Sequence, residues 1–317
     1  MSKKIIIDTD PGVDDAMAIL FALKSPEVEV VALTTIFGNV HTDLATQNAL
    51  RLIELAGQPD IPVARGAEMP LVVPLGNIAD FVHGTDGFGQ TNQPPPKGRT
   101  LNKPAAQLIV EAIMAYPGEI TLVPLGPLTN IALALALEPR IAGNVAAVVL
   151  MGGAATVNGN VNPAAEANII NDPHAAEVVF NAGWPVTMVG LDVTMQTIMT
   201  DEYLASLKAS GTRTAEFIYD ISRFYRDFHD RAYQLEGIHT HDPSAVAYVI
   251  DPTLFTTASG AVRVVTDGIA IGQTLMDRRQ CWNKANAWSN RPRVNVCLGV
   301  DFERLLTMYK MRITAVD

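Results

Sequence analysis

The segment DTDPGVDD, which follows a run of isoleucines near the amino terminus, concentrates negative charge. It places four carboxylates within eight positions: Asp8, Asp10, Asp14 and Asp15. Two carboxylates about 4 Å apart repel each other by roughly 4 kcal/mol at an effective dielectric constant near 20. No lysine or arginine occurs between Lys4 and Lys24 to neutralise them. Either the carboxyl pKa values rise or a cation binds, and an all-oxygen ligand set favours Ca²⁺ or Mg²⁺ over zinc.

A simpler interpretation assigns these acids to local structure. Asp14 and Asp15 would cap a helix and offset its dipole, while Asp8 and Asp10 would be turn residues. Capping needs only one or two acids, and it leaves the pair at the strand end unexplained. The whole cluster therefore favours a metal site, in which the Pro-Gly turn brings the strand end and the helix start to one point.

A second polar cluster, GIHTHDP, lies far downstream. His239 and His241 alternate as on a strand, and Asp242 precedes a helical pattern at 244–250. One interpretation is an aspartate at the start of a helix, before a proline at its first position, with two surface histidines. A zinc site would need a third ligand, and none is obvious. The other histidines are scattered along the chain: His41, His83, His174 and His229.

A third cluster, NGNVNPAAEANIINDPHAA, is rich in amides. It contains hydrogen-bonding side chains but no cation: Asn158, Asn160, Asn162, Glu166 and Asn168. Such donors and acceptors suit the hydroxyl groups of a polyol. The alternative is a turn-rich loop that closes at Asp172, which would cap the next helix.

Apolar, β-branched runs alternate with helical patterns along the chain. The runs are continuous, which predicts strands covered on both faces, as in parallel sheets. The predicted strands are 5–7, 28–35, 120–123, 145–150 and 186–189, and the predicted helices are 16–23, 44–56, 105–115, 128–137 and 175–180. We expect an α/β fold with an open, mostly parallel, Rossmann-like sheet and helices on both faces.

The chain is expected to form a single domain, residues 1–317, with a helical cap within 200–235 and a proline-rich surface loop at 92–100. Ligands of open parallel sheets bind beyond the carboxyl ends of the strands. Polar or glycine-rich turns follow several predicted strands: 8–10, 38–39, 125–127 and 151–153. We expect these turns to converge on one crevice.

Composition excludes several classes of function. The 317 residues carry a net charge of -10, which argues against a nucleic-acid partner because such binding depends on lysine and arginine. No apolar stretch is long enough to cross a membrane, and the amino terminus lacks the apolar region of a secretory signal. The two cysteines, Cys281 and Cys297, form no metal or disulfide motif. A cytoplasmic protein is expected.

The three polar clusters described above resemble motifs of the inosine-uridine-preferring nucleoside hydrolases. The motifs that carry the resemblance occur in order along nearly the whole chain: DTDPGVDD, TTIFGNV, VPLGPLTNIA, MGGA, AEANIINDPHAA and the HD of His241-Asp242. The resemblance implies an N-glycosidase that holds one Ca²⁺ at the bottom of its pocket. By similarity the ligands are Asp10, Asp15, Asp242 and the main-chain carbonyl of Leu125.

The resemblance also implies which residues bind the ribose and line its pocket: Asp14, Asn39, Met151, Asn160, Glu166 and Asn168. Cleavage of the N-glycosidic bond passes through an oxocarbenium-like ribosyl group, which nearby carboxylates stabilise. Asp10 is expected to act as general base on a Ca²⁺-bound water. His241 is the candidate acid for the departing base, and His83 is a second candidate at the substrate.

One position departs from the family pattern. Ala167 stands where the family often has a phenylalanine, in AEFN, so the preferred nucleobase stays open. Other aromatic residues are candidates for the missing contact, although helical spacing of aromatics is typical of a core: Phe88, Phe224, Tyr225, Phe228 and Tyr233. The resemblance further implies a homodimer or homotetramer.

Two other functions fit parts of the sequence. Asp8-Thr9-Asp10 also matches the nucleophile-x-acid loop of a Mg²⁺-dependent phosphatase of the haloacid-dehalogenase type, although the amide-rich segment suits hydroxyls better. A non-catalytic binder of ribose or nucleosides would retain affinity without releasing a base.

Overall fold

The computed structural model describes residues 2–279 and 285–316, and Cys281 lies outside them. Within the described chain, nine strands form one sheet in the order β10-β9-β11-β6-β5-β4-β1-β2-β3, and two more form a small antiparallel pair, β7-β8. The strands are β1 (Lys3–Thr9), β2 (Val28–Thr35), β3 (Val63–Arg65), β4 (Ile120–Pro124), β5 (Ala147–Met151), β6 (Val186–Val189), β7 (Ile198–Thr200), β8 (Gly237–His239), β9 (Phe255–Val264), β10 (Thr274–Asp277) and β11 (Arg293–Val300).

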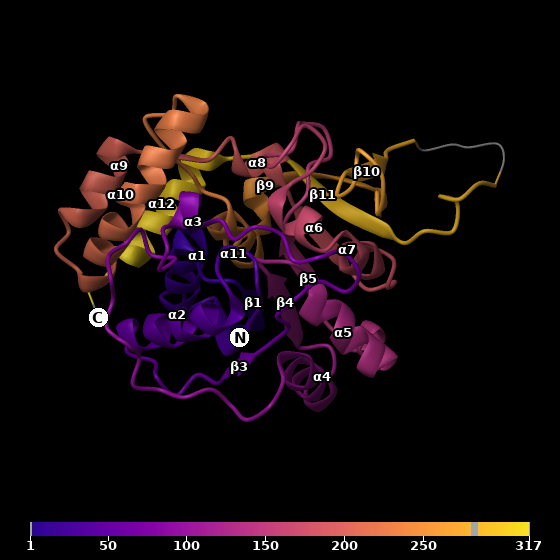
Figure 1. Ribbon diagram of the computed structural model, residues 1–317, viewed down its shortest axis with the longest axis horizontal. Coiled ribbons are helices and arrows are strands. Elements are labelled where there is room, and N and C mark those ends of the chain that lie inside the picture. Colours follow the sequence, from indigo (N-terminus) through magenta and orange to yellow (C-terminus); the bar gives the residue numbers. More distant parts are fainter. Residues whose placement is uncertain (1, 280–284, 317) are drawn as a thin grey trace.

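Most neighbouring strands in the large sheet run parallel (Figure 1). Only β9 runs against its neighbours, β11 and β10, at one edge. The strand order reverses between β1 and β4, because the chain proceeds from β1 to β2 and β3 on one side and returns to β4 on the other. Such a reversal opens a crevice at the carboxyl ends of the strands. The predicted fold class is confirmed.

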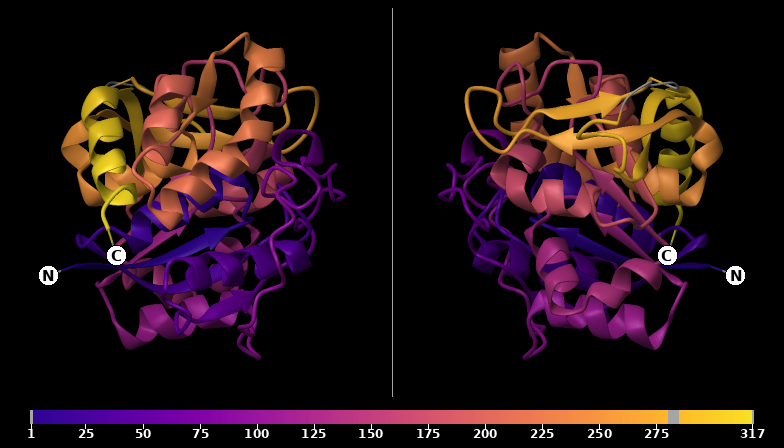
Figure 2. Two further views of the ribbon diagram at one scale, coloured as in Figure 1. Left: turned by 90° about the vertical axis from the view of Figure 1, so that its left-hand side faces the viewer. Right: turned by 90° about the vertical axis from the view of Figure 1, so that its right-hand side faces the viewer.

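Helices cover both faces of the sheet (Figure 2). They are α1 (Val13–Leu23), α2 (Thr42–Leu55), α3 (Asp80–His83), α4 (Ala105–Ala115), α5 (Thr129–Leu137), α6 (Ala167–Asn171), α7 (Pro173–Phe180), α8 (Leu191–Thr194), α9 (Asp201–Lys208), α10 (Arg213–Tyr233), α11 (Asp242–Ile250) and α12 (Phe302–Ile313). The predicted helices match α1, α2, α4, α5, α7 and α11, with ends displaced by a few residues at most.

The isoleucines of β1 explain why the sheet is covered on both sides. Ile5 and Ile7 belong to the core that contains residues of α1, α2, α10, α11 and α12, whereas Ile6 belongs to the core formed with α4, α5 and α7. All three side chains are fully buried. Successive side chains on a strand point to opposite faces, so a continuous apolar run is what two covered faces require.

The segment 200–235 contains α9 and α10, and α10 contacts both α1 and α3. Residues 92–100 form neither helix nor strand and are largely exposed, which confirms the predicted surface loop. Among the described residues, no helix combines the length and the apolar character that a membrane span requires.

Candidate active site

The acidic motif lies at the point where the strand order reverses. Asp10 follows β1, the Pro-Gly turn leads into α1, and Leu125 follows the adjacent strand, β4. The N–H of Leu125 donates to the carbonyl of Asp8 at 2.7 Å, which fixes the two strand ends side by side. The fold thus brings together two of the turns that the sequence predicted to converge.

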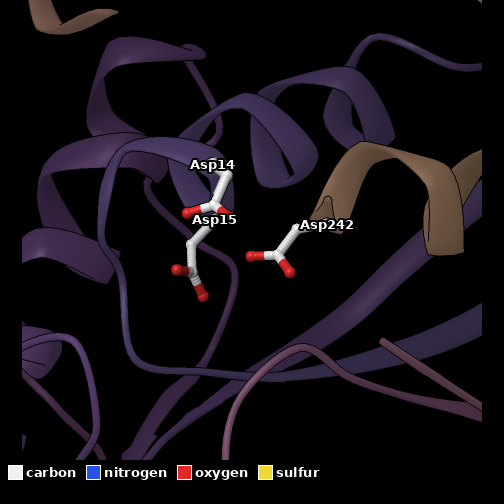
Figure 3. Close-up of side chains that lie close together, drawn as sticks. All are labelled: Asp14, Asp15 and Asp242. Atoms are coloured by element: carbon white, nitrogen blue, oxygen red, sulfur yellow. The ribbon is translucent and has the colours of Figure 1, made fainter. Parts of the chain in front are cut away.

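Three carboxylates meet above these strand ends. Asp14 and Asp15 occupy the first turn of α1, and Asp242 is the first residue of α11. One oxygen atom from each lies within 4.8 Å of the others, and all three residues are buried (Figure 3). The packing of α1 against α11 therefore unites acids that are more than 200 positions apart in the sequence.

Asp15 and Asp10 are held by hydrogen bonds around this cluster. Asp15 accepts from the hydroxyl of Thr9, from the N–H of Gly12 at 3.1 Å and from the side-chain amide of Asn39 at 2.9 Å. The main-chain N–H of Asn39 donates to Asp10 Oδ2 at 2.5 Å. Asp10 Oδ1 is buried and has no hydrogen-bond partner among the described residues.

Two glycines allow Asp10 to sit in this position. A Cβ added at Gly38 would lie 2.0 Å from Asp10 Oδ2, and one added at Gly126 would lie 2.3 Å from Asp10 Oδ1. Gly38 also has a φ of +153°, at the margin of the conformations that L residues rarely adopt. Glycine is therefore required on both sides of this carboxylate.

The electrostatics of the cluster favour a bound cation. Burial raises the pKa of Asp14 to about 6, and burial with repulsion from Asp14, Asp15 and Asp10 raises the pKa of Asp242 well above its usual range. Burial, followed by repulsion from Asp15, likewise raises the pKa of Asp10. Asp14 Oδ1 and Asp10 Oδ1 are both buried without partners among the described residues. These oxygens fit a divalent cation that prefers oxygen ligands.

Asp8, the first acid of the motif, has a different role. Asp8 lies within β1, before the turn that carries the other acids. Its Oδ1 accepts from the hydroxyl of Thr34 at 2.5 Å and from the side-chain amide of Asn130 at 2.8 Å. Burial raises its pKa to about 7. Asp8 is not part of the group formed by Asp14, Asp15 and Asp242, and its two hydrogen bonds tie β1 to β2 and α5.

A cavity of about 290 Å³ opens above the carboxylates. It is lined by all seven residues that the sequence assigned to substrate binding: Asp14, Asn39, His83, Met151, Asn160, Glu166 and Asn168. Leu125, His241 and Asp242 also line it, whereas Asp10 and Asp15 are not on its wall. The amide-rich segment, which could have been a simple turn, therefore contributes one side of the cavity.

Hydrogen bonds to the main chain fix the amide-rich side. Glu166 is the N-cap of α6, where Oε1 accepts the N–H of Asn168 at 2.9 Å and Oε2 accepts the N–H of Gly153 at 2.9 Å. Asn168 Nδ2 donates to the carbonyl of Leu125 at 2.7 Å. Asn160 Oδ1 accepts the N–H of residue 167 at 3.0 Å. These side chains are oriented before any ligand arrives.

Two histidines on the wall are held in defined orientations. His83 Nδ1 accepts the N–H of Val13 at 3.2 Å, and burial lowers its pKa to about 4. His241 Nδ1 shares a hydrogen bond of 2.8 Å with the hydroxyl of Thr194. Burial, together with neighbouring histidines, lowers the pKa of His241 well below its usual value. Both rings are therefore neutral near pH 7.

The interpretation of His239 and His241 as surface residues is wrong. Their exposed fractions are 6% and 8%. The ring of His239 lies 5.2 Å from that of His229 and 5.7 Å from that of His241. The only cluster of metal-binding type found among the described residues is formed by carboxylates, so these histidines do not form a zinc site there.

Aromatic side chains close the upper part of the cavity. Tyr225, Phe228 and Tyr233 line it from α10, and Phe81 lines it from α3. The rings of Phe81 and Phe228 meet edge to face with centroids 5.8 Å apart. Tyr225 stacks on His83 and its hydroxyl donates to Asp14 Oδ2 at 3.4 Å, so α10 reaches the carboxylate cluster.

The sequence identified some of these aromatic residues but not all. Phe88 is buried and packs against Phe217, and neither it nor Phe224 lines the cavity. Phe81 and His229 were missed. His229 was predictable, because it lies four positions after Tyr225 and four before Tyr233 on the same helix face. Phe81 gave no such signal, since its four-residue helix has no periodicity to detect.

A doubly wound sheet, an acidic cluster at its strand ends and a preformed polar and aromatic cavity define an α/β enzyme acting on a small molecule. A family model described as inosine-uridine preferring nucleoside hydrolase matches residues 5–307. The chain belongs to this family, as the resemblance in its sequence predicted.

Individual relatives agree over nearly the full chain. The chain is 49% identical over 313 residues to a probable uridine nucleosidase 2 of Arabidopsis thaliana, covering 98% of this chain and 97% of the relative. It is 45% identical over 282 residues to an inosine-uridine preferring nucleoside hydrolase of Leishmania major, covering 88% and 89%. A solved plant nucleoside hydrolase superposes with a TM-score of 0.98 at 46% identity, covering 100% of both chains.

Proposed function

We propose that this protein hydrolyses the N-glycosidic bond of ribonucleosides and releases ribose and the free base. The observation that carries the proposal is the buried group of Asp14, Asp15 and Asp242, whose oxygens lie within 4.8 Å of one another beside a cavity with a polar and an aromatic side. Anionic oxygens beside a ribosyl group stabilise the positive charge that develops as the base departs. Family membership supports the same reaction.

The carboxylates fit one Ca²⁺, and Asp10, Asp15, Asp242 and the carbonyl of Leu125 would hold it. Asp10 Oδ1 and Asp14 Oδ1 are among the buried carboxylate oxygens without partners in the described chain, and both support a cation at this place. When bound, the ion would orient ribose hydroxyls and lower the pKa of a nearby water. Asp14, which lines the cavity, would then remain available to the ribose.

Asp10 would take the proton from the attacking water. Its Oδ2 is fixed by the N–H of Asn39, and its Oδ1 has no partner among the described residues, so one oxygen is oriented and the other is free to accept a proton. A positioned carboxylate of raised pKa is a suitable general base near neutral pH. Asn39 thereby aligns the base while its side-chain amide also holds Asp15.

The amide-rich side would bind the ribose. Glu166 Oε1 accepts one N–H at 2.9 Å and therefore has a further lone pair for a hydroxyl. Asn168, Asn160 and Asn39 contribute amide groups to the same wall, and Met151 supplies apolar contact. A polyol is a better ligand for these groups than a phosphate, because the wall they form contributes no lysine or arginine.

His241 would protonate the departing base, and His83 would bind the substrate. In the tautomer in which Thr194 donates to Nδ1, the neutral His241 ring carries its proton on Nε2 and would donate a hydrogen bond to the departing base. Full transfer of that proton would require the ring to be protonated on both nitrogens, so that it returns to the neutral form. His83 receives the N–H of Val13 on Nδ1, so its proton is also on Nε2. His83 thus offers its N–H from Nε2, and His241 does so in the tautomer in which Nδ1 accepts.

The phosphatase alternative is weakened by Asp8, which would be the nucleophile in that mechanism. Its carboxylate is buried, and Oδ1 is engaged by Thr34 and Asn130. A non-catalytic binder would not need a buried proton acceptor such as Asp10.

We propose further that residues 1–317 act as one unit, that α9 and α10 cover the site as its cap, and that the chain forms a homodimer or homotetramer.

The test is release of base from uridine and inosine by the parent protein and by Asp10→Ala, measured by chromatography with calcium present. Asp10→Ala should abolish release while the circular dichroism spectrum is unchanged, and the exposed Asp60→Ala serves as the matched control. Unchanged turnover by Asp10→Ala would contradict the role of Asp10. Turnover of an aryl phosphate in place of nucleosides would favour the phosphatase.

A further inference from the structure

His229 is a buried histidine on the cavity wall that the mechanism does not use. It lies on α10, is 1% exposed, and packs between Tyr225 and His239, whose ring centroids are 4.3 Å and 5.2 Å away. Tyr233, which also lines the cavity, has its ring 5.5 Å from that of His229. His229 therefore belongs to the aromatic side of the cavity, opposite in character to the amide-rich side.

The hydrogen bonds of His229 define which nitrogen carries its proton. Nδ1 lies 2.9 Å from the main-chain carbonyl of Tyr225, and a carbonyl can only accept, so Nδ1 is the donor. Burial lowers the pKa of the ring to about 4, so it is neutral near pH 7 and Nε2 has a lone pair. Nε2 is buried and has no hydrogen-bond partner among the described residues.

An unpartnered buried acceptor is costly, and a donor on a ligand in the adjoining cavity would relieve that cost. The nucleobase is the part of the substrate that suits the aromatic side. Uracil and hypoxanthine carry a ring N–H beside a carbonyl, whereas cytosine and adenine have a lone pair on the corresponding ring nitrogen. Two lone pairs facing each other leave both groups unsatisfied, which is how a polar site rejects a near-isosteric ligand.

Resting on the proposed function, we propose that His229 is a specificity-determining residue whose Nε2 accepts the ring N–H of a lactam base. The enzyme then prefers uridine to cytidine. The names of several relatives, which are uridine nucleosidases or inosine-uridine preferring hydrolases, agree with this choice of base. The fixed proton on Nδ1 is essential, because a ring free to change tautomer would accept either kind of base.

The test compares kcat/KM for uridine and cytidine in the parent protein, His229→Phe and His229→Gln. The parent should favour uridine by at least about tenfold, as expected for one unpaired buried polar group. His229→Phe should remove most of this ratio, chiefly by raising KM for uridine, because the contact is the same in the ground state and the transition state. His229→Gln should retain uridine hydrolysis and gain cytidine hydrolysis, since an amide can rotate to accept or donate.

His174→Gln is the matched control, because His174 lies on α7 and does not line the cavity. Its uridine-to-cytidine ratio should equal that of the parent. An unchanged ratio in folded His229→Phe or His229→Gln would overturn the assignment, as would a parent that prefers cytidine through its exocyclic amino group. A parent that hydrolyses both equally would overturn this inference alone, whereas no base release from either would overturn the proposed function as well.

Discussion

Replacing Asp242 with asparagine is expected to stabilise the protein when no metal is bound, although it removes a proposed ligand. Carboxylate oxygens of Asp14, Asp15 and Asp242 lie within 4.8 Å of one another, and each ionised pair at that distance repels by about 3.5 kcal/mol at an effective dielectric constant near 20. The substitution removes two of the three pairs. Because the raised pKa values allow proton uptake to relieve part of the repulsion, we expect a gain of about 1–3 kcal/mol near pH 8.

The assay is urea unfolding of the parent, Asp242→Asn and the exposed control Asp60→Asn, each in excess EDTA and in CaCl₂. In EDTA the unfolding midpoint of Asp242→Asn should exceed that of the parent. In CaCl₂ the parent should gain stability through binding to the folded state, and Asp242→Asn should gain little. A variant that is less stable than the parent in EDTA, or that gains as much from calcium, would refute the repulsion argument.

Two further predictions concern protonation. Burial raises the pKa of Asp14 to about 6 and the pKa of Asp8 to about 7. Between pH 3.8 and pH 7 the folded state therefore binds more protons than the unfolded state. The unfolding free energy of the metal-free protein should fall as the pH rises through this range. A rise, measured by urea unfolding in EDTA, would contradict this sign. His241→Gln should lower kcat for uridine by about 10²–10⁴-fold, with a smaller change in KM. Steady-state kinetics that show a change in KM alone would exclude the role of His241 as the acid.

Much of the fold was predictable because its main strands are covered on both faces. The continuous apolar runs of β1, β2, β4, β5 and β6 distinguish them from helices and from half-exposed strands. Strands at or next to the sheet edges, such as β3 and β9, were missed for the converse reason. β3 has only three residues, and β9 has exposed residues among buried ones, so neither forms a continuous apolar run.

The candidate site was predictable where the local sequence limits the chemistry. Acids flanking a Pro-Gly turn indicate repulsion between carboxylates that a bound cation can offset. An amide-rich segment without lysine or arginine indicates a ligand with hydroxyl groups. What the sequence could not resolve was the separation of Asp8 from its neighbours. Its partner Asn130 lies 122 positions away on α5, so only the folded structure reveals that this carboxylate is structural.

The histidines illustrate a similar limit. His229, His239 and His241 lie close together because α10 packs against β8, which leads into α11. In the sequence these residues belong to different elements with no common period. Helical spacing relates His229 only to Tyr225 and Tyr233, and it does not specify which nitrogen is free. That detail depends on the 2.9 Å contact with the carbonyl of Tyr225.

The central claim is that buried carboxylates hold one Ca²⁺ that hydrolysis of nucleosides requires. The most direct measurement combines elemental analysis of purified protein with uridine turnover before chelation, after chelation and after calcium is returned. We predict about one calcium per chain, loss of base release when it is removed, and recovery when it is restored. Full turnover by protein that contains no divalent metal would contradict the account.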